Sequence, residues 1–409
     1  MSDVLRSINL SLMAKFMGPF LGLTTIGLIS KLYGPESVGF YTSFLQLLII
    51  FGIFCRYGSD FVLMKSLSQY SVDVTNLWII KEVCKIFFPI LICTVVILFL
   101  GFDQLNWPVI NIFRGNDWLI LTTMAVSTIY VFLISILIAR NKIFSSIVLQ
   151  SIVTPLIILL VILFLPKENL SILHSLLFGF LASLIVSVFY LISSLNSFVH
   201  VPCKKPCGYF QGFSISISEA VFYNSDIFLL SFFVSFVDLA AYALASRLSI
   251  MYGFYVQMNN AAIVGDISSM LARGEKTKLL VFRKKFITRN LFFSCLYVIA
   301  LIVAGYLARL MLGLNYEKVF FYTILLSVPG FLGCLYGFTT TFRFLISDRY
   351  SRLDGNLNIL FMLFYVSIFL LFANFFGISG AIFVTVVFKS IYYLSFNSRL
   401  KKVLENYDY

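Results

Sequence analysis

Ionisable side chains lie inside long apolar stretches of this sequence. Asp226 and Arg247 belong to the segment NSDIFLLSFFVSFVDLAAYALASRL, at 224–248, which predicts two membrane helices joined by a turn at 236–239. A charge inside a bilayer costs about 2.5–3.5 kcal/mol even on a lenient insertion scale, so it usually faces a partner or a wet cavity. Counted from that turn at about 1.5 Å per residue, the two charges lie roughly 15 and 12 Å deep, so we predict that they pair.

Four basic residues are candidates for a single cationic cavity that binds substrate: Lys15, Arg56, Arg247 and Lys389. Fixed cations in a low-dielectric cleft bind an anion such as a diphosphate more strongly than they would in water. Arg56 lies near a helix end, where snorkelling to the headgroups is an alternative, and Lys389 fits either role. Arg247 has no membrane surface within easy reach, so it is the strongest candidate.

Two acidic residues could position these cations or carry a coupling ion. Glu219 precedes Asp226 by seven residues, which is nearly two helical turns, so both carboxylates share a helix face. We predict a structural or ion-coupling role for both. The source of energy is left open between a proton gradient, a sodium gradient and the membrane potential.

Signals of an enzyme are weak in this sequence. His174 and His200 are isolated, and the chain has no phosphate-binding Gly loop and no HExxH or GxSxG motif. The seven cysteines are an odd number without a CxxC pair. Cys203 and Cys207 are better explained by a reduced loop than by a metal site. We therefore predict no catalytic residue, no bound metal, no cofactor and no enzymatic activity.

The composition indicates that lipid is the solvent of this chain. Of its 409 residues, 60% are hydrophobic and 12% are charged, with a mean hydropathy of +0.97, whereas globular domains carry about 25% charged residues. Runs of about 20 apolar residues indicate membrane helices. Twelve such spans are predicted at 10–32, 38–56, 79–100, 118–138, 145–165, 171–195, 214–236, 239–264, 290–312, 319–342, 356–375 and 378–397.

The basic residues lie mainly on one side of these spans. With the N-terminus inside, 23 of the 30 Lys and Arg fall on inside segments and five on outside segments, while Arg247 and Lys389 lie within spans. Cytoplasmic loops carry such an excess, so we expect a multi-pass protein with both termini in the cytoplasm. This topology accounts for the net charge of +12, and no nucleic-acid partner is expected. The inside segment 265–289 is predicted to form a basic amphipathic helix on the membrane surface.

A linker divides the spans into two sets of six. It is placed at 197–213, between an N-lobe at 1–196 and a C-lobe at 214–409. The triplets at 39–41 and 240–242 both read small-x-Tyr, a faint repeat of the kind that relates transporter halves. The predicted fold class is an all-α polytopic membrane protein of two six-helix lobes.

Adjacent Gly and Pro residues inside two spans predict hinges. Gly18 precedes Pro19 in the first span, and Pro329 precedes Gly330 in the tenth. Proline removes a backbone donor and bends a helix, which suits a transporter that alternates between two states. Close packing is the alternative, because Gly and Pro are ordinary in membrane helices.

Three stretches resemble one family of membrane transporters. LYGPESVGFY at 32–41 resembles the first outer turn of polysaccharide-exporting flippases, and FGISGAIFVT at 376–385 resembles the entry to their last helix. AYALASRL at 241–248, with Asp226 ahead of it, resembles their seventh and eighth helices. The family is that of the O-antigen (Wzx-type) flippases, in the polysaccharide transporter family of the multidrug/oligosaccharidyl-lipid/polysaccharide (MOP) exporter superfamily.

The resemblance implies two lobes that form a V around a central cavity in the bacterial inner membrane. The cargo it implies is a polyprenyl-diphosphate-linked oligosaccharide, the O-antigen repeat unit of lipopolysaccharide biosynthesis. Alternating access would move this lipid from the cytoplasmic to the periplasmic leaflet. In the lipid II branch of the superfamily, the arginine matching Arg247 lines a cationic cavity with basic residues of the first two helices, here Lys15 and Arg56. The implied partners are this substrate and the bilayer, with other polysaccharide-assembly membrane proteins left open.

Two other functions fit the same length and number of spans. A cation-coupled multidrug antiporter of the same superfamily would need a net anionic cavity, whereas Lys15, Arg247 and Lys389 make this one positive. A membrane polysaccharide polymerase or acyltransferase acting outside would need a sizeable outer loop with catalytic groups, and the longest outer segment here is 101–117.

Overall fold

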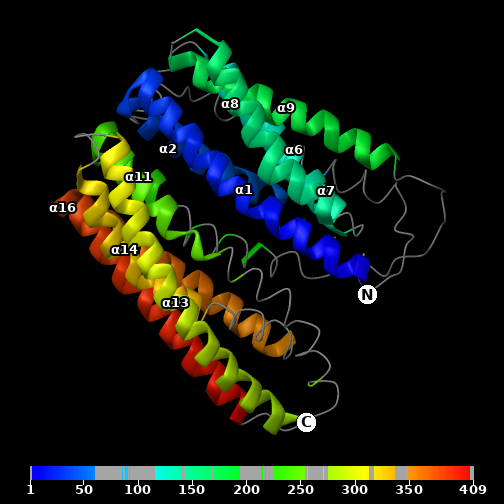
Figure 1. Cartoon of the computed structure of the whole chain (residues 1–409), viewed down its shortest axis with the longest axis vertical. Coiled ribbons are helices and arrows are strands. Elements are labelled where there is room, and N and C mark those ends of the chain that lie inside the picture. Colours follow the sequence, from blue (N-terminus) through cyan, green and yellow to red (C-terminus); the bar gives the residue numbers. More distant parts are fainter. Residues whose placement is uncertain are drawn as a thin grey trace. The chain divides into compact units, whose positions relative to one another are not determined.

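The computed structural model contains two compact units, Met1–Phe232 and Phe233–Tyr409. The structure describes residues 2–59, 85, 88–90, 92, 116–139, 143–166, 169–193, 213, 214, 217, 221, 225–253, 256, 270, 275–312, 317–336 and 348–405. Every regular element within these ranges is a helix (Figure 1). The linker predicted at 197–213 lies outside them except for Phe213, so the predicted lobe boundary stays a prediction.

Helices of membrane length make up the N-terminal unit. Helix α6 packs against α2 and α9, and α1 packs along α2 and along the chain segment from α7 to α8. The elements are α1 (Ser2–Tyr33), α2 (Pro35–Arg56), α6 (Asp117–Ala139), α7 (Ile143–Val148), the π-helix η2 (Leu149–Val153), α8 (Thr154–Phe164) and α9 (Asn169–Ser193).

Gly34 joins α1 to α2 without a loop. Its φ of +89° lies in the region that side chains with a Cβ rarely adopt. Pro35 follows at the start of α2, where its missing N–H has no helical partner to lose. The hydroxyl of Tyr33 donates to the carbonyl of Ile162 at 3.2 Å, which ties this turn to α8.

The span predicted at 145–165 changes its winding halfway along. Helix α7 passes into the π-helix η2 and then into α8. Pro155, the second residue of α8, lacks an N–H and would clash with the carbonyl four residues back in a regular helix. Thr154 donates its N–H to the carbonyl of Leu149, five residues back. The wider turn therefore accommodates the proline within a continuous span.

The C-terminal unit contains α11 (Phe236–Ser249), α13 (Lys276–Leu312), α14 (Glu317–Tyr336) and α16 (Asp348–Glu405). Helices α13 and α14 are antiparallel neighbours. The rings of Tyr306 and Phe320 lie 6.2 Å apart near one end, and the amide of Asn290 donates to the carbonyl of Leu335 at 3.5 Å near the other. Helix α14 also contacts α11 and α16.

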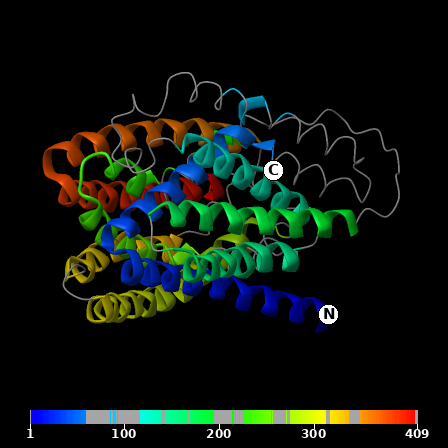
Figure 2. The same ribbon diagram turned by 90° about the horizontal axis from the view of Figure 1, so that it is seen from above.

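Helix α16 is two membrane passes joined at Gly377, whose φ of +57° and ψ of −136° are not helical. Figure 2 shows the chain reversing there, with its orange and red halves running back along each other. Ring contacts confirm an antiparallel hairpin, because Phe372 faces Phe383 at 5.9 Å and Phe361 faces Phe388 at 5.7 Å. A Cβ at Gly377 would be strained by the positive φ.

Seven described helices are long and apolar enough to cross a membrane. Most predicted spans fall on them, and the long segment Asn356–Lys402 covers the two spans predicted at 356–375 and 378–397. The predicted span at 79–100 lies almost wholly outside the described residues. The chain is thus an all-helical, multi-pass membrane protein.

The predicted turn in the segment 224–248 is wrong. The turn occupies 231–234 rather than 236–239, because Ser235 caps the N-terminus of α11 and Phe236 is already helical. Helix α11 ends at Ser249, residues 252, 253 and 256 are helical again, and the span end predicted at 264 lies outside the described residues.

The basic segment 265–289, predicted as an amphipathic helix on the membrane surface, also differs from the prediction. Residues from Lys276 onward belong to α13, which continues without a break into the membrane span and ends at Leu312. The basic residues of 276–289 therefore form the first turns of a membrane helix.

Candidate functional site

Arg56 lies in the last turn of α2 and is only 9% exposed. Its Nε donates to the carbonyl of Gly52 at 3.0 Å, one turn back in the same helix. A cation is favoured at this end of a helix because the last carbonyls are unpaired. The side chain is thus buried within protein rather than extended to a membrane surface, which disfavours snorkelling. Its contact with substrate stays a prediction.

The end of α2 beside Arg56 is closed by aromatic packing. Tyr57 adopts a left-handed conformation, with φ of +44°, and its N–H bonds to the carbonyl of Ile53 at 3.1 Å. Its ring stacks on Phe213 at 4.9 Å, and Phe54 contacts the same ring at 5.7 Å. The chain that leads to Asp226 is thereby anchored at the end of α2.

Lys389, in the second half of α16, is only 7% exposed. Thr385, Lys389 and Tyr393 recur every four residues and therefore share one face of the helix. The hydroxyls of Tyr365 and Thr385 lie 3.3 Å apart, so they bridge the two halves of the α16 hairpin. A lysine buried in this setting does not snorkel to a membrane surface. Its contact with substrate stays a prediction.

A tyrosine cluster lies on the same face of α16. The hydroxyls of Tyr393 and Tyr252 are 2.5 Å apart, and the ring of Tyr252 meets that of Tyr297 edge to face. The hydroxyl of Tyr297 donates to the carbonyl of Ser249, the last residue of α11. Gly333 provides the space for Tyr252, because a Cβ there would lie 2.2 Å from the ring. Sequence reasoning missed this cluster, since it joins residues far apart in the chain.

Asp226 has no solvent-exposed surface and lies in the helical residues 225–230. Its Oδ1 accepts the backbone N–H of Ile227 at 2.9 Å. With the turn at 231–234, Asp226 lies five residues before the turn rather than the predicted ten. Glu219, its predicted companion, lies outside the described residues.

Arg247 lies in the last turn of α11, twelve residues after the cap at Ser235. It is half-buried, whereas the preceding residues from Leu239 to Ser246 are all buried. Its position near a helix C-terminus favours the charged side chain. The equal depth expected for Asp226 and Arg247 depended on the misplaced turn, so their pairing remains a prediction without that support. Lys15 lies in α1, and its side chain is outside the described residues.

The two predicted hinges are sites of close packing. A Cβ at Gly18 would lie 3.1 Å from the Cβ of Ser151, so α1 touches the π-helix η2 just before Pro19. A Cβ at Gly330 would lie 2.9 Å from the ring of Tyr297, next to Pro329 in α14. Close packing, the alternative to a hinge, is therefore present at both glycines, and bending at either place stays a prediction.

A buried hydroxyl network holds the π-helix of the N-terminal unit. Thr154 Oγ1 lies 2.8 Å from the Tyr130 hydroxyl and 2.7 Å from the Ser183 hydroxyl, and it donates to the carbonyl of Leu149 at 2.9 Å. It thus connects α6, α8 and α9. In the sequence, Pro155 indicates an irregularity in this span. The hydroxyl network itself has no sequence pattern, because its members are single residues on separate helices.

An ion pair at one end of the C-terminal unit was also missed. Lys318 Nζ donates to Asp238 Oδ1 at 3.0 Å, and the Ser235 hydroxyl donates to Asp238 Oδ2 at 2.9 Å. The hydrogen bond from Lys318 is the main cause that holds the pKa of the Asp238 carboxyl below its ordinary value. A Ser followed three residues later by Asp is a helix-cap signature, which could have located the start of α11.

No protein-family model and no curated protein matches the sequence. Solved structures match it over nearly its whole length. The lipid II flippase MurJ, in an inward closed conformation, aligns with 96% of this chain and 87% of its own, at 17% identity and a TM-score of 0.70.

Multidrug transporters match as well. An inward-facing multidrug resistance MATE family transporter of the MOP superfamily covers 97% of this chain and 100% of its own, at 13% identity and a TM-score of 0.65. The MATE transporter VcmN of Vibrio cholerae covers 100% and 97%, at 16% identity and a TM-score of 0.59. At these identities the likeness shows the fold, and it confirms the predicted fold class of twelve helices in two lobes. The chain has the fold of MOP-superfamily transporters.

Proposed function

We propose that the protein is a flippase that moves a polyprenyl-diphosphate-linked oligosaccharide, an O-antigen repeat unit, from the cytoplasmic to the periplasmic leaflet of the bacterial inner membrane. The fold is shared with the lipid II flippase MurJ. The observation that carries the proposal is the burial of basic side chains within membrane helices, Arg56 at 9% and Lys389 at 7% exposure. Basic side chains inside membrane helices are rare and often mark a substrate or ion pathway, and an anionic cargo is a substrate that such side chains would bind.

Alternating access is the proposed mechanism. A diphosphate would bind to the basic residues Lys15, Arg56, Arg247 and Lys389, which lie on both sequence halves. An inside-negative potential drives an anion outward by about 2.3 kcal/mol per charge per 100 mV, so a dianion gains roughly twice that. Bending of α1 at Gly18 and Pro19 would change which leaflet the substrate meets.

Arg247 is the residue to test first. In a strain that lacks its flippase and makes the matching oligosaccharide, Arg247→Ala is expected to reduce surface polysaccharide at least about tenfold. The basis for this magnitude is that removing one partner of a charged hydrogen bond costs roughly 1.5–3 kcal/mol. Arg247→Lys keeps the charge and should retain part of the export.

The matched control is Lys31→Ala, because Lys31 is exposed in the last turn of α1 and lies outside the candidate set. Surface polysaccharide is scored by gel, with protein abundance measured in the same membranes. Normal export by Arg247→Ala at normal abundance would contradict the cationic-cavity proposal.

A multidrug antiporter is the second candidate, favoured by the MATE transporters among the similar structures. A fully buried carboxylate such as Asp226 is a group that could exchange a coupling cation. Expression in a drug-sensitive strain separates the two functions. We expect no increase in resistance to cationic drugs. An increase without restored polysaccharide would favour the antiporter.

A further inference from the structure

Helix α13 is longer than a bilayer is thick. Its 37 residues extend about 55 Å, compared with roughly 30 Å of hydrocarbon. Large apolar side chains are exposed along its later part, where they face lipid: Leu291, Phe292, Leu296, Ile299, Val303, Tyr306 and Leu307. The turns before Leu291 therefore extend beyond the hydrocarbon.

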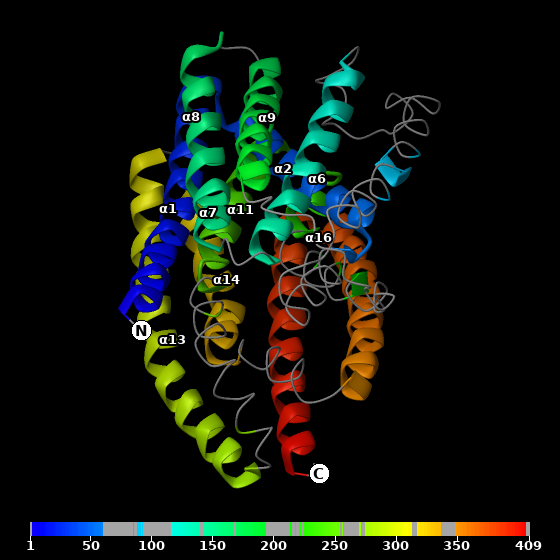
Figure 3. The ribbon, with the colours of Figure 1, turned by 90° about the vertical axis from the view of Figure 1, so that its right-hand side faces the viewer.

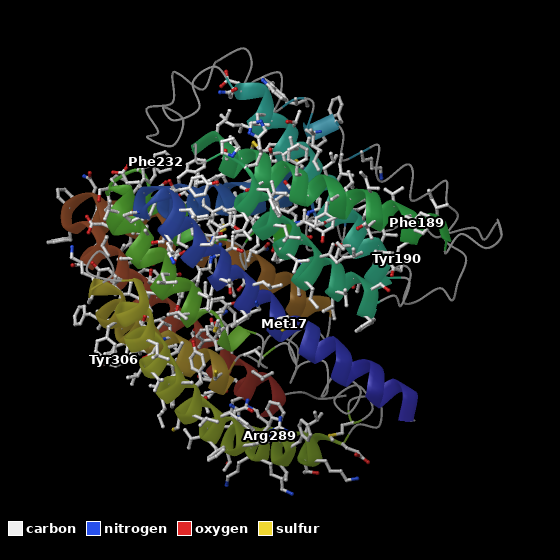
Figure 4. The ribbon with its side chains drawn as sticks, turned by 45° about the horizontal axis from the view of Figure 1, so that its top comes forward. Met17, Phe189, Tyr190, Phe232, Arg289 and Tyr306 are labelled. Atoms are coloured by element: carbon white, nitrogen blue, oxygen red, sulfur yellow. The ribbon has the colours of Figure 1, made fainter. Side chains whose placement is uncertain are left out.

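Those first turns of α13 carry exposed basic side chains. Lys284, Lys285 and Arg289 are all exposed, and they precede Leu291 by seven, six and two residues. At about 1.5 Å per residue they lie roughly 3–10 Å beyond the lipid-facing stripe. A headgroup layer is roughly 5–8 Å thick on each side, so these cations lie at headgroup depth. Figure 4 shows Arg289 near this end of α13 and Tyr306 toward the other.

The second half of α16 repeats the pattern. Ile391 and Leu394 are its last large exposed apolar side chains. Arg399 and Lys402 follow Leu394 by five and eight residues and are exposed. That spacing places them roughly 8–12 Å beyond the stripe, at the outer edge of the headgroup layer.

A hydrogen bond joins the two helices at this end. Arg283 Nη2 donates to Asn397 Oδ1 at 2.6 Å, one residue before Lys284 in α13 and two residues before Arg399 in α16. Figure 3 shows the beginning of α13 and the C-terminus at the same end of this unit. The sequence has no Asp or Glu at 276–310 or at 355–404, and the acidic residues of α16 are Asp348 and Asp354 near its start and Glu405 at its last position.

We propose that Lys284, Lys285, Arg289, Arg399 and Lys402, the basic collar, form a binding site for the headgroups of anionic phospholipids. The collar lies within the headgroup layer and at its outer edge, and its five side chains are all exposed and basic. A basic group near a membrane surface contributes about fivefold in affinity for an anionic leaflet. We assign membrane headgroups as the occupant because the collar directly borders the lipid-facing stripe. The bilayer surface already fills the space beside it, so an acidic soluble protein would have to displace lipid to bind there.

The test measures which lipid stays with the purified full-length protein. The protein is reconstituted in nanodiscs of equal parts phosphatidylglycerol and phosphatidylcholine, and the lipids retained after transfer to detergent are counted by native mass spectrometry. We expect retention of phosphatidylglycerol over phosphatidylcholine, decreasing as salt is raised. The fourfold variant Lys284→Gln, Lys285→Gln, Arg399→Gln and Lys402→Gln should lower this preference at least about tenfold.

The matched control keeps all four charges, as Lys284→Arg, Lys285→Arg, Arg399→Lys and Lys402→Arg. It should retain the preference, which excludes a general effect of four substitutions. Equal retention of the two lipids by the unmodified protein, or an unchanged preference in the neutral variant, would overturn the proposal. Displacement of the retained phosphatidylglycerol by an acidic soluble protein added to the nanodiscs would overturn it as well. Surface polysaccharide is scored in parallel, so that a failed flippase proposal is distinguished from a failed lipid site.

Discussion

At the scale of single residues, the ion pair between Asp238 and Lys318 links the first turn of α11 to the start of α14. The Asp238 carboxylate accepts from Lys318 and from Ser235, which also caps α11 through the N–H of Asp238. The two side chains are 41% and 64% exposed, so solvent screens most of the attraction. This pair is a local contact whose stabilising effect depends on pH.

Asp238→Asn is expected to lower the free energy of unfolding by at most about 1 kcal/mol near neutral pH. The pKa of this carboxyl is lowered by the hydrogen bond from Lys318. The stabilisation is therefore complete above the unfolded-state pKa, about 3.9, and is lost as pH falls through the lower folded-state value. Unfolding midpoints in detergent should differ between the two proteins near neutral pH and converge below about pH 4.

Lys318→Met provides the control for this prediction. It should cause a loss similar to that of Asp238→Asn, and the double variant should lose no more than either single one, because both remove the same contact. A difference that stays constant down to low pH would show that the ion pair is not its cause.

At the scale of elements, the π-helix η2 is the most specific local feature of the N-terminal unit. It lies between α7 and α8 on the same span. Gly18 of α1 packs against its residue Ser151, and the hydroxyl of Thr154, which follows it, hydrogen-bonds to Ser183 of α9. The sequence predicts a membrane helix at 145–165 and shows Pro155 within it, but it does not indicate a π turn. The π turn could not be predicted, because it depends on hydroxyls contributed by α6 and α9 and on the close approach of α1.

Thr154→Val is expected to destabilise the protein by about 1–2 kcal/mol. The substitution keeps the shape but removes an oxygen that bonds Tyr130, Ser183 and the carbonyl of Leu149, and hydrogen bonds between membrane helices are worth roughly 0.6–2 kcal/mol. The measurement is the unfolding midpoint in detergent.

Thr123→Val is the matched control for this substitution. Thr123 is also buried, but its hydroxyl donates to the carbonyl of Leu119 in its own helix. It should cost less than about 0.5 kcal/mol, because the helical carbonyl keeps its backbone partner. Equal effects of the two variants would count against a special role of the network.

At the scale of the whole molecule, the class of fold was predictable and the position of the central turn was not. Composition and the lengths of apolar runs are enough to assign a polytopic helical protein, because lipid excludes other spanning structures. The turn in 224–248 was misplaced because hydropathy does not change across it. The cap at Ser235 and Asp238 carries the information that hydropathy lacks. Burial of Arg56 and Lys389 could not be predicted, because snorkelling and burial produce the same sequence pattern.

The energy source for transport is a property of the whole molecule that Asp226 can test. If its fully buried carboxylate exchanges a coupling ion, flipping in proteoliposomes should collapse when the ion gradient is dissipated at a fixed membrane potential. Asp226→Asn should remove that dependence and leave only the response to potential. Transport by the unmodified protein that ignores the ion gradient would leave the potential alone as the driving force.

The reversal of α16 at Gly377 has a consequence for the synthesis of the chain. A single residue departs from helical geometry there, so no hydrophilic loop separates the two passes. The sequence carries no Asp, Glu, Lys, Arg or His between Asp354 and Lys389, so no charge at the turn could anchor one pass on the far side before the other emerged. The insertion machinery must therefore release both passes into the bilayer as one hairpin, with its orientation set by the basic residues at its two ends.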